Sequence, residues 1–125
     1  MISEIHDSKI LSYQVDFEKL ELKMLIEDEG NIKHRIMFKK LLTFHFEHQL
    51  PNSILLDVIK GKIEDFLSEN KELLFEGKNY YWPLDYETDE ELLQYLNENS
   101  LNYYKVQSSY GLNGWILCSQ YYIEE

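Results

Sequence analysis

Two histidines and a glutamate stand close together at His45, Glu47 and His48. Imidazole and carboxylate groups are common zinc ligands, so this spacing first suggests a metal site. On a β-strand, however, His45 and Glu47 share one face while His48 points to the other. The zinc-binding pattern His-Glu-x-x-His also requires a helix and a different order of residues. We therefore expect no metal and no cofactor, and we interpret these histidines as residues at the edge of the core or in solvent.

The residues that serve as nucleophiles in other proteins also lack a catalytic setting. Cys118 lies in an apolar stretch, where a thiol usually behaves as a small buried hydrophobe. Neither Ser108-Ser109 nor Ser119 lies in the Gly-x-Ser-x-Gly pattern of a nucleophile elbow. Gly111 and Gly114 do not match the spacing of phosphate-binding loops. These observations predict a protein that is not an enzyme.

Aromatic residues gather in the segment 80–87, directly before an acidic stretch. Tyrosine and tryptophan offer large contact areas with a polar group, and binding hot spots are enriched in them. The candidate residues for binding a protein partner are Tyr80, Trp82, Tyr86, Asp89, Glu90 and Glu91. In the alternative interpretation, Tyr81, Trp82 and Leu84 pack the helices onto a sheet.

The charge of the chain is large and unevenly distributed. Twelve Lys and Arg against 23 Asp and Glu give a formal net charge of −11 and a sequence pI near 4.7. Residues 64–98 hold eleven of the acids against only Lys71 and Lys78. Nucleic-acid backbone and anionic membranes would be repelled, whereas a basic protein would be attracted. Alternatively, the acids only keep two helices well solvated.

Composition also suggests a compartment and a domain count. The single cysteine excludes an intrachain disulfide and favours a reducing, cytoplasmic location. No apolar run approaches the roughly 20 residues that a membrane-spanning helix needs, and residues 1–7 lack the features of a signal peptide. With 125 residues, 44% of them hydrophobic, we expect a single domain over residues 1–125.

The N-terminal half shows the two-residue alternation of β-strands. Leu11, Tyr13, Val15 and Phe17 would form one buried face, and a hairpin near Glu18-Lys19 would follow. Strands are predicted over 10–17, 20–26, 32–48 and 54–59, with a bulge or bend in the third at Lys39-Lys40.

The middle of the chain changes to helical periodicity. A helix is predicted over 63–75, with Gly77 at its C-terminal cap; the alternative is a shorter helix followed by a hairpin at 76–79. Thr88 and Glu91 form the sequence pattern of a capping box, so a second helix should begin there and end at 97–99.

The C-terminal quarter returns to strand-forming residues, at 103–107 and 115–122. Asn113-Gly114 lies between them and is a strong hairpin signal. The order of elements predicts an α+β fold: an antiparallel sheet of hairpin-rich N-terminal and C-terminal strands, with two helices inserted between them and packed on one face.

Two short stretches carry a resemblance. His6-Asp7-Ser8 before the first hairpin, and residues 108–115 near the end, are similar to parts of small uncharacterised bacterial proteins. Some acidic proteins of this size act as immunity partners that block a basic toxin domain. The resemblance implies a protein-binding function of that type.

Three functions follow as hypotheses. The first is a cytoplasmic binding module of the immunity-inhibitor type that covers a basic protein with an acidic, aromatic-bearing face. The second is a small-ligand-binding protein or enzyme with a pocket between sheet and helices, near His45, Glu47 and the C-terminal tyrosines. The third is a homo-oligomer that pairs through a tyrosine-rich edge strand.

Overall fold

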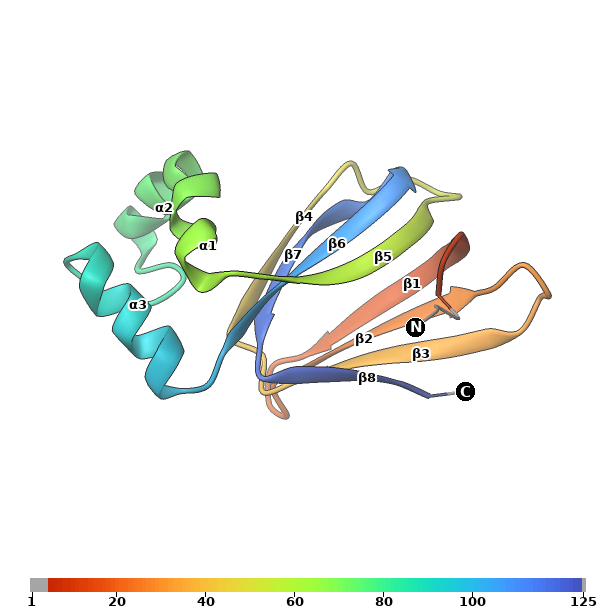
Figure 1. Ribbon diagram of the computed structural model, residues 1–125, viewed down its shortest axis with the longest axis horizontal. Coiled ribbons are helices and arrows are strands. Elements are labelled where there is room, and N and C mark those ends of the chain that lie inside the picture. The colour runs from red at the N-terminus through yellow and green to blue at the C-terminus, as the bar shows by residue number, and fades with distance from the viewer. Residues whose placement is uncertain (1–4, 125) are drawn as a thin grey trace.

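The computed structural model describes residues 5–124 and has the predicted α+β architecture (Figure 1). Residues 1–4, part of the segment compared with a signal peptide, and Glu125 lie outside the described residues. In chain order the elements are β1 (Ser8–Asp16), β2 (Glu21–Glu27), β3 (Lys33–Lys39), β4 (Thr43–Glu47), β5 (Ile54–Gly61), α1 (Ile63–Glu69), α2 (Lys71–Gly77), the short 3-10 helix η1 (Lys78–Tyr80), α3 (Asp89–Glu98), β6 (Asn102–Tyr110), β7 (Asn113–Cys118) and β8 (Gln120–Glu124).

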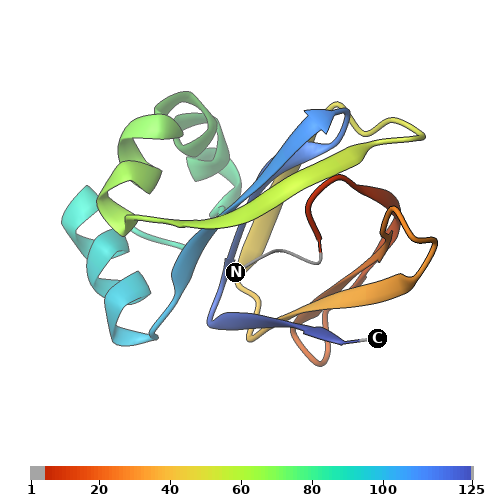
Figure 2. The ribbon, with the colours of Figure 1, turned by 45° about the vertical axis from the view of Figure 1, so that its right-hand side comes forward.

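All eight strands belong to one antiparallel sheet, in the order β4-β7-β6-β5-β1-β2-β3-β8. The predicted long strand bends at Lys40, which has a φ of 55°, so that β3 and β4 pair with different partners. The predicted strand 115–122 also divides, at Ser119, into β7 and β8. The hydrogen bonds Leu42 N to Leu117 O and Ser119 N to Lys39 O, both 2.9 Å, continue the pairing through these two bends. The sheet therefore folds over into two facing layers (Figure 2).

The main core lies between these two layers. In β2 the alternate residues Leu22, Met24 and Ile26 are fully buried, and Ile36 and Phe38 of β3 stand opposite Met24 and Leu22. Because successive side chains of a strand point to opposite faces, each strand supplies every second residue to this core. Each such side chain contributes about 1.5–3 kcal/mol by burial.

A second hydrophobic cluster joins the helices to the outer face of β6 and β7. Phe66 of α1 and Leu92 and Leu96 of α3 are fully buried against Trp115 and Leu117. The helices thus cover one face of the sheet at one end of the molecule, as predicted (Figure 1).

The first helix differs from the prediction, because Asn70 divides the range 63–75 into α1 and α2. The described residues therefore contain three α-helices where two were expected. Gly77 is not a left-handed cap, since its φ is −68° and it lies within α2. It is needed for space instead, because a Cβ atom there would collide with Trp82.

Of the four residues predicted to form the buried face of the first strand, only two pack against the core. The register shifts between Ile10 and Ser12, which marks a β-bulge. Leu11 falls in this irregularity and is exposed, while Tyr13 and Val15 pack against the core. Phe17 lies beyond the end of β1 and is exposed in the turn.

The capping box was predicted correctly, whereas the turn of the C-terminal hairpin lies at other residues than predicted. The Oγ1 of Thr88 accepts a hydrogen bond from the Glu91 amide at 3.2 Å, so α3 begins where predicted. The hairpin is present, but Gly111, with a φ of 81°, lies in its turn, and Asn113 and Gly114 belong to β7. Gly114 has no room for a side chain, because a Cβ atom would overlap the carbonyl oxygen of His45 in the neighbouring strand.

Candidate functional site: the acidic helical end and its cleft

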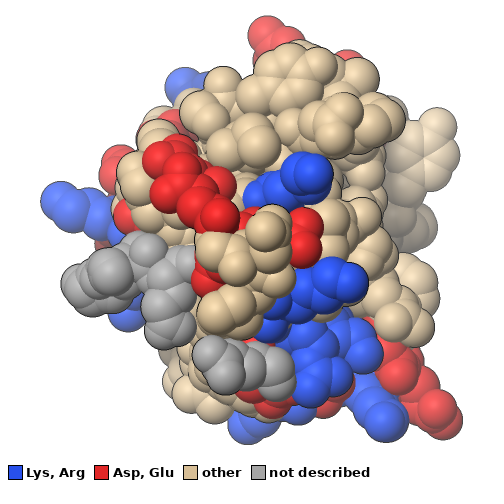
Figure 3. Space-filling model, turned by 90° about the vertical axis from the view of Figure 1, so that its right-hand side faces the viewer, with Lys and Arg blue, Asp and Glu red and all other residues tan. Residues whose placement is uncertain are grey.

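Residues 63–98, here called the helical end, carry a concentrated negative charge. They hold eleven acidic residues against Lys71 and Lys78, and they form one end of the molecule (Figure 1). Within residues 5–124, Glu69 is the one acid of this segment that lies within 4 Å of a cationic side chain. At the opposite end, Lys and Arg gather beside acidic residues (Figure 3), and Arg35 and Glu124 form one pair there whose charges offset each other. The negative field is therefore strongest at the helical end.

The aromatic segment after α2 is divided between surface and core. Tyr80 and Tyr81 are 82% and 70% exposed. Trp82 is half-buried: its Nε1 donates a 2.9 Å hydrogen bond to Thr43 Oγ1, and its ring centroid lies 5.9 Å from that of Trp115. Of these aromatic rings, only those of Tyr80 and Tyr81 are widely accessible to a partner.

Tyr86 belongs to the cluster beneath the helices and is only 9% exposed. Burial, followed by the charge of Asp89, raises the pKa of its phenol. The Nζ of Lys78 lies 4.8 Å from the centroid of its ring. Tyr86 therefore anchors α3 and offers a partner little contact area.

The three acidic candidates lie on the surface in the first turn of α3. Glu91 also has a structural role, since its Oε1 accepts hydrogen bonds from the amides of Glu87 at 2.6 Å and Thr88 at 3.2 Å. These two bonds lower the pKa of the Glu91 carboxyl. Asp89 and Glu90 are the members of the set whose charge can be altered without removing the cap.

Sequence reasoning missed Phe75, which is 78% exposed in the last turn of α2. A signal was present, because Leu73, Leu74 and Phe75 are consecutive and one face of a helix cannot bury all three. Phe75, Tyr80 and Tyr81 are three large exposed side chains within seven residues. Single exposed apolar residues are ordinary, and these three stand out because they are close together in the sequence of the acidic helical end.

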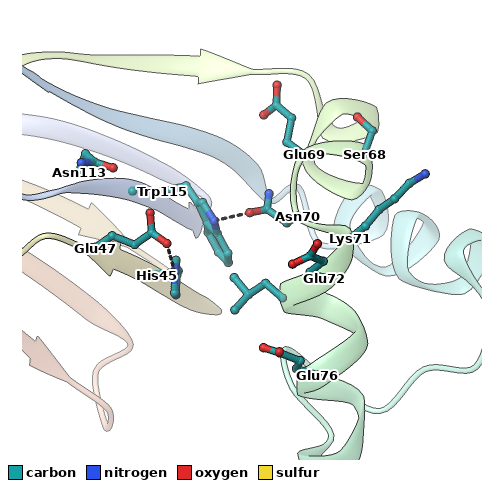
Figure 4. A pocket seen from close by; sticks show the side chains of 12 residues that line it. His45, Glu47, Ser68, Glu69, Asn70, Lys71, Glu72, Glu76, Asn113 and Trp115 are labelled. Atoms are coloured by element: carbon teal, nitrogen blue, oxygen red, sulfur yellow. Dashed lines mark hydrogen bonds and ion pairs between the residues drawn. The ribbon is translucent and has the colours of Figure 1, made fainter.

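A cleft of about 730 Å³ lies between strands β4 and β7 on one side and helices α1 and α2 on the other (Figure 4). One wall comes from β4 and β7 and the other from α1, Asn70 and α2. It lies where the second sequence hypothesis placed a pocket, next to His45 and Glu47, although the C-terminal tyrosines do not line it. The lining residues are His45, Glu47, Ser68, Glu69, Asn70, Lys71, Glu72, Leu73, Glu76, Asn113, Gly114 and Trp115.

Hydrogen bonds hold the sheet side of the cleft in place. His45 Nε2 lies 3.5 Å from Glu47 Oε2, which shows that these two side chains share a face as predicted. Trp115 Nε1 donates to Asn70 Oδ1 at 2.9 Å, and Asn70 Nδ2 donates to the hydroxyl of Tyr103 at 3.3 Å. The side chains of Asn70 and Trp115, at the inner side of the cleft, are therefore held by hydrogen bonds.

Glu69 closes one end of this network. The hydroxyl of Tyr103 donates to Glu69 Oε1 at 2.8 Å, and Lys105 Nζ lies 3.0 Å from the same oxygen. The hydrogen bond from Tyr103 and then the one from Lys105 lower the pKa of Glu69. Burial, with a smaller effect of Glu69, raises the pKa of Tyr103 to about 12. Glu69 thus stays anionic and Tyr103 stays neutral at physiological pH.

Two further features of the described residues are the spacing of their metal-ligating groups and the setting of the thiol. Among residues 5–124, no three His, Cys, Asp or Glu side chains lie close enough together to hold a metal ion. Cys118 is fully buried, and burial raises the pKa of its thiol to about 12. It therefore packs as a hydrophobe.

No family model and no curated protein matches this chain. Within residues 5–124, the helices are too short and too polar to cross a membrane.

Proposed function

We propose that this protein is a small binding module that engages a positively charged protein through its helical end, as an immunity-type inhibitor. The observation that carries the proposal is the exposed group Phe75, Tyr80 and Tyr81 among carboxylates that lack cationic partners within the described residues. A cytoplasmic location, where Cys118 stays reduced, belongs to the same proposal.

Binding would proceed by attraction and then by burial. The carboxylates raise the rate of encounter with a basic protein over about one Debye length, roughly 8 Å at physiological salt. Burial of the exposed rings then contributes a few kcal/mol at the contact. Inhibition follows from occlusion, because the bound module covers the functional surface of its partner.

The test starts from a tagged chain used to capture proteins from the source organism, followed by purification of the partner and an assay of its activity. Asp89→Asn with Glu90→Gln removes two charges at the helical end and keeps the capping residue Glu91. Glu18→Gln with Glu29→Gln is the matched control, since both residues are exposed and lie in turns of the N-terminal strands.

The expected partner is basic, is inhibited by the protein, and binds the first variant about tenfold more weakly than the control at low salt. Tyr80→Ser should weaken binding at every salt concentration, because it removes contact area and not charge. An acidic partner, or equal loss in both charge variants, would show that the helical end does not direct binding.

The cleft favours a second candidate, a protein that binds a small cationic ligand beside His45 and Trp115. A ligand that binds only the folded state raises the unfolding temperature. Thermal-shift screening against polyamines and guanidinium compounds tests this candidate directly. It fails if no compound in the panel raises the midpoint.

A further inference from the structure

Carboxylates face each other across the cleft and converge on the ring of His45, which covers the buried ring of Trp115 (Figure 4). Glu47 comes from β4, while Glu72 and Glu76 lie one turn apart on α2 and extend toward the strands (Figure 4). Between them lie the rings of Trp115 and His45, whose centroids are 6.1 Å apart. The walls thus supply negative charge, and the partly exposed ring of His45 supplies a flat surface between them.

The cations nearest the cleft do not neutralise this charge. Lys71 lines the cleft but extends away from the strands in Figure 4. Lys105 pairs with Glu69, at one end of the cleft. In the described residues 5–124, no cation lies within 4 Å of Glu72 or Glu76. Like charges four residues apart on a helix cost a few tenths of a kcal/mol, so a cation between them and the sheet would remove an existing repulsion.

The same chain already uses carboxylate and aromatic groups together to hold a cation. Lys105 Nζ lies 3.0 Å from Glu69 Oε1 and 5.5 Å from the ring centroid of Tyr103. Both Glu69 and Tyr103 belong to the network that borders the cleft. The cleft repeats this combination with Glu47, Glu72 and Glu76 around the ring of His45, but within the described residues no lysine lies within 4 Å of these three carboxylates.

We propose that the cleft between α2 and strands β4 and β7 receives an arginine side chain from a basic segment of the partner. This inference rests on the proposed function and names the part of the partner that is recognised. A guanidinium group is planar, so it can stack on the ring of His45, whose side chain is 32% exposed, while its N–H groups reach carboxylates on both sides. A volume of about 730 Å³ exceeds one guanidinium, and it also accommodates the neighbouring residues of the segment.

The test uses the fluorescence of the two tryptophans, since Trp115 lies in the cleft and the ring of Trp82 is 5.9 Å from it. The probe is a tetra-arginine peptide with an acetylated N-terminus and an amidated C-terminus. The uncharged comparison is a tetra-glutamine peptide blocked in the same way. Titration of the full chain should change the emission with the arginine peptide only. Free arginine amide is titrated in parallel.

Two double variants locate the binding. Glu72→Gln with Glu76→Gln removes the carboxylates of the α2 wall. Glu64→Gln with Glu98→Gln removes the same charge from α1 and α3, outside the cleft. We expect the first variant to lose about tenfold in affinity for the arginine peptide and the second about twofold, because distant exposed charges are screened. Circular dichroism checks that both variants fold.

Several results would overturn the cleft assignment. One is an equal loss of affinity for the arginine peptide in the two variants, and another is no binding of that peptide at all. A third is free arginine amide binding as tightly as the peptide, which would indicate a small-molecule site. If the natural partner binds the α2 variant as well as wild type, the cleft is refuted while the proposed function stands. If wild type captures no basic partner, the proposed function fails, and the peptide titration still measures whether the cleft recognises arginine.

Discussion

The side-chain oxygen of Asn70 accepts a 2.9 Å hydrogen bond from the indole nitrogen of Trp115. Asn70 lies at the break between α1 and α2, and Trp115 lies in the middle of β7. The bond therefore links the helical end to the sheet at the inner side of the cleft. Trp115 is only 5% exposed, so its N–H has little access to water if Asn70 is lost.

We predict that Asn70→Ala lowers the free energy of unfolding by about 1–3 kcal/mol, because a buried donor then lacks its acceptor. Urea unfolding followed by tryptophan fluorescence measures the change. Asn79→Ala, at an exposed position in η1, is the control and should stay within about 0.5 kcal/mol of wild type. Equal midpoints for the two variants would mean that the Asn70–Trp115 bond contributes no stability.

Gly114→Ala should be strongly destabilising, by at least ~2 kcal/mol, since the new methyl group would overlap the carbonyl oxygen of His45 in β4. Gly30→Ala has only the Asp28 carboxylate nearby, at 3.4 Å, and should be tolerated. Thermal unfolding of both variants compares them. If Gly114→Ala unfolds at the wild-type temperature, β4 and β7 do not approach as closely as described.

Thr88→Ala should cost about 1 kcal/mol, because the amide of Glu91 loses the Oγ1 that caps α3. Thr88→Ser keeps a hydroxyl in the same place and should recover most of the loss. Chemical denaturation of the three proteins should give the order wild type, serine variant, alanine variant. A serine variant as unstable as the alanine variant would assign the effect to the lost methyl group and not to the cap.

Ionisation of the Tyr103 phenol should lower the free energy of unfolding at alkaline pH. Its pKa is about 12 in the folded protein and about 10 when unfolded, so the folded state holds the extra proton in this window. Its contribution is complete below about pH 10 and is lost as the pH rises toward 12. Tyr103→Phe should therefore flatten the decline of stability between these pH values, as measured by urea unfolding at each pH.

Tyr80→Phe is the matched control for this measurement, since it removes a phenol from the surface. Burial also raises the pKa values of Tyr86, Tyr104 and Tyr121, so part of the alkaline decline should remain in the Tyr103 variant. An unchanged slope in Tyr103→Phe would show that its phenol ionises equally easily in the folded and unfolded chains.

Elements with strong local signals were predicted correctly from sequence. Alternation in Leu22, Met24 and Ile26 places these residues in the core, because strand periodicity is a property of the local backbone. Thr88 and Glu91 are three residues apart, so the cap of α3 also needs no distant partner. The bend at Lys40 was predicted for a similar reason, since two lysines interrupt an apolar pattern.

The errors arose where a distant contact overrides a local preference. Gly77 resembles a helix cap, yet the nearby ring of Trp82 explains the glycine. Asn113-Gly114 resembles a hairpin turn, yet the approach of His45 from β4 explains Gly114. The break at Asn70 was not predicted, because the hydrogen bonds of Asn70 to Trp115 and Tyr103 join residues more than thirty positions apart.

The amino-acid sequence by itself determined the fold class, the charge of residues 64–98 and the start of α3, because composition and short-range periodicity carry that information. Only the tertiary structure decided which aromatic rings reach the surface. Tyr80 and Tyr86 have similar chemistry and lie six residues apart, but one is in solvent and the other lies under the helices. The cleft, too, depends on packing, because its two walls come from segments that meet only when the helices dock on β7.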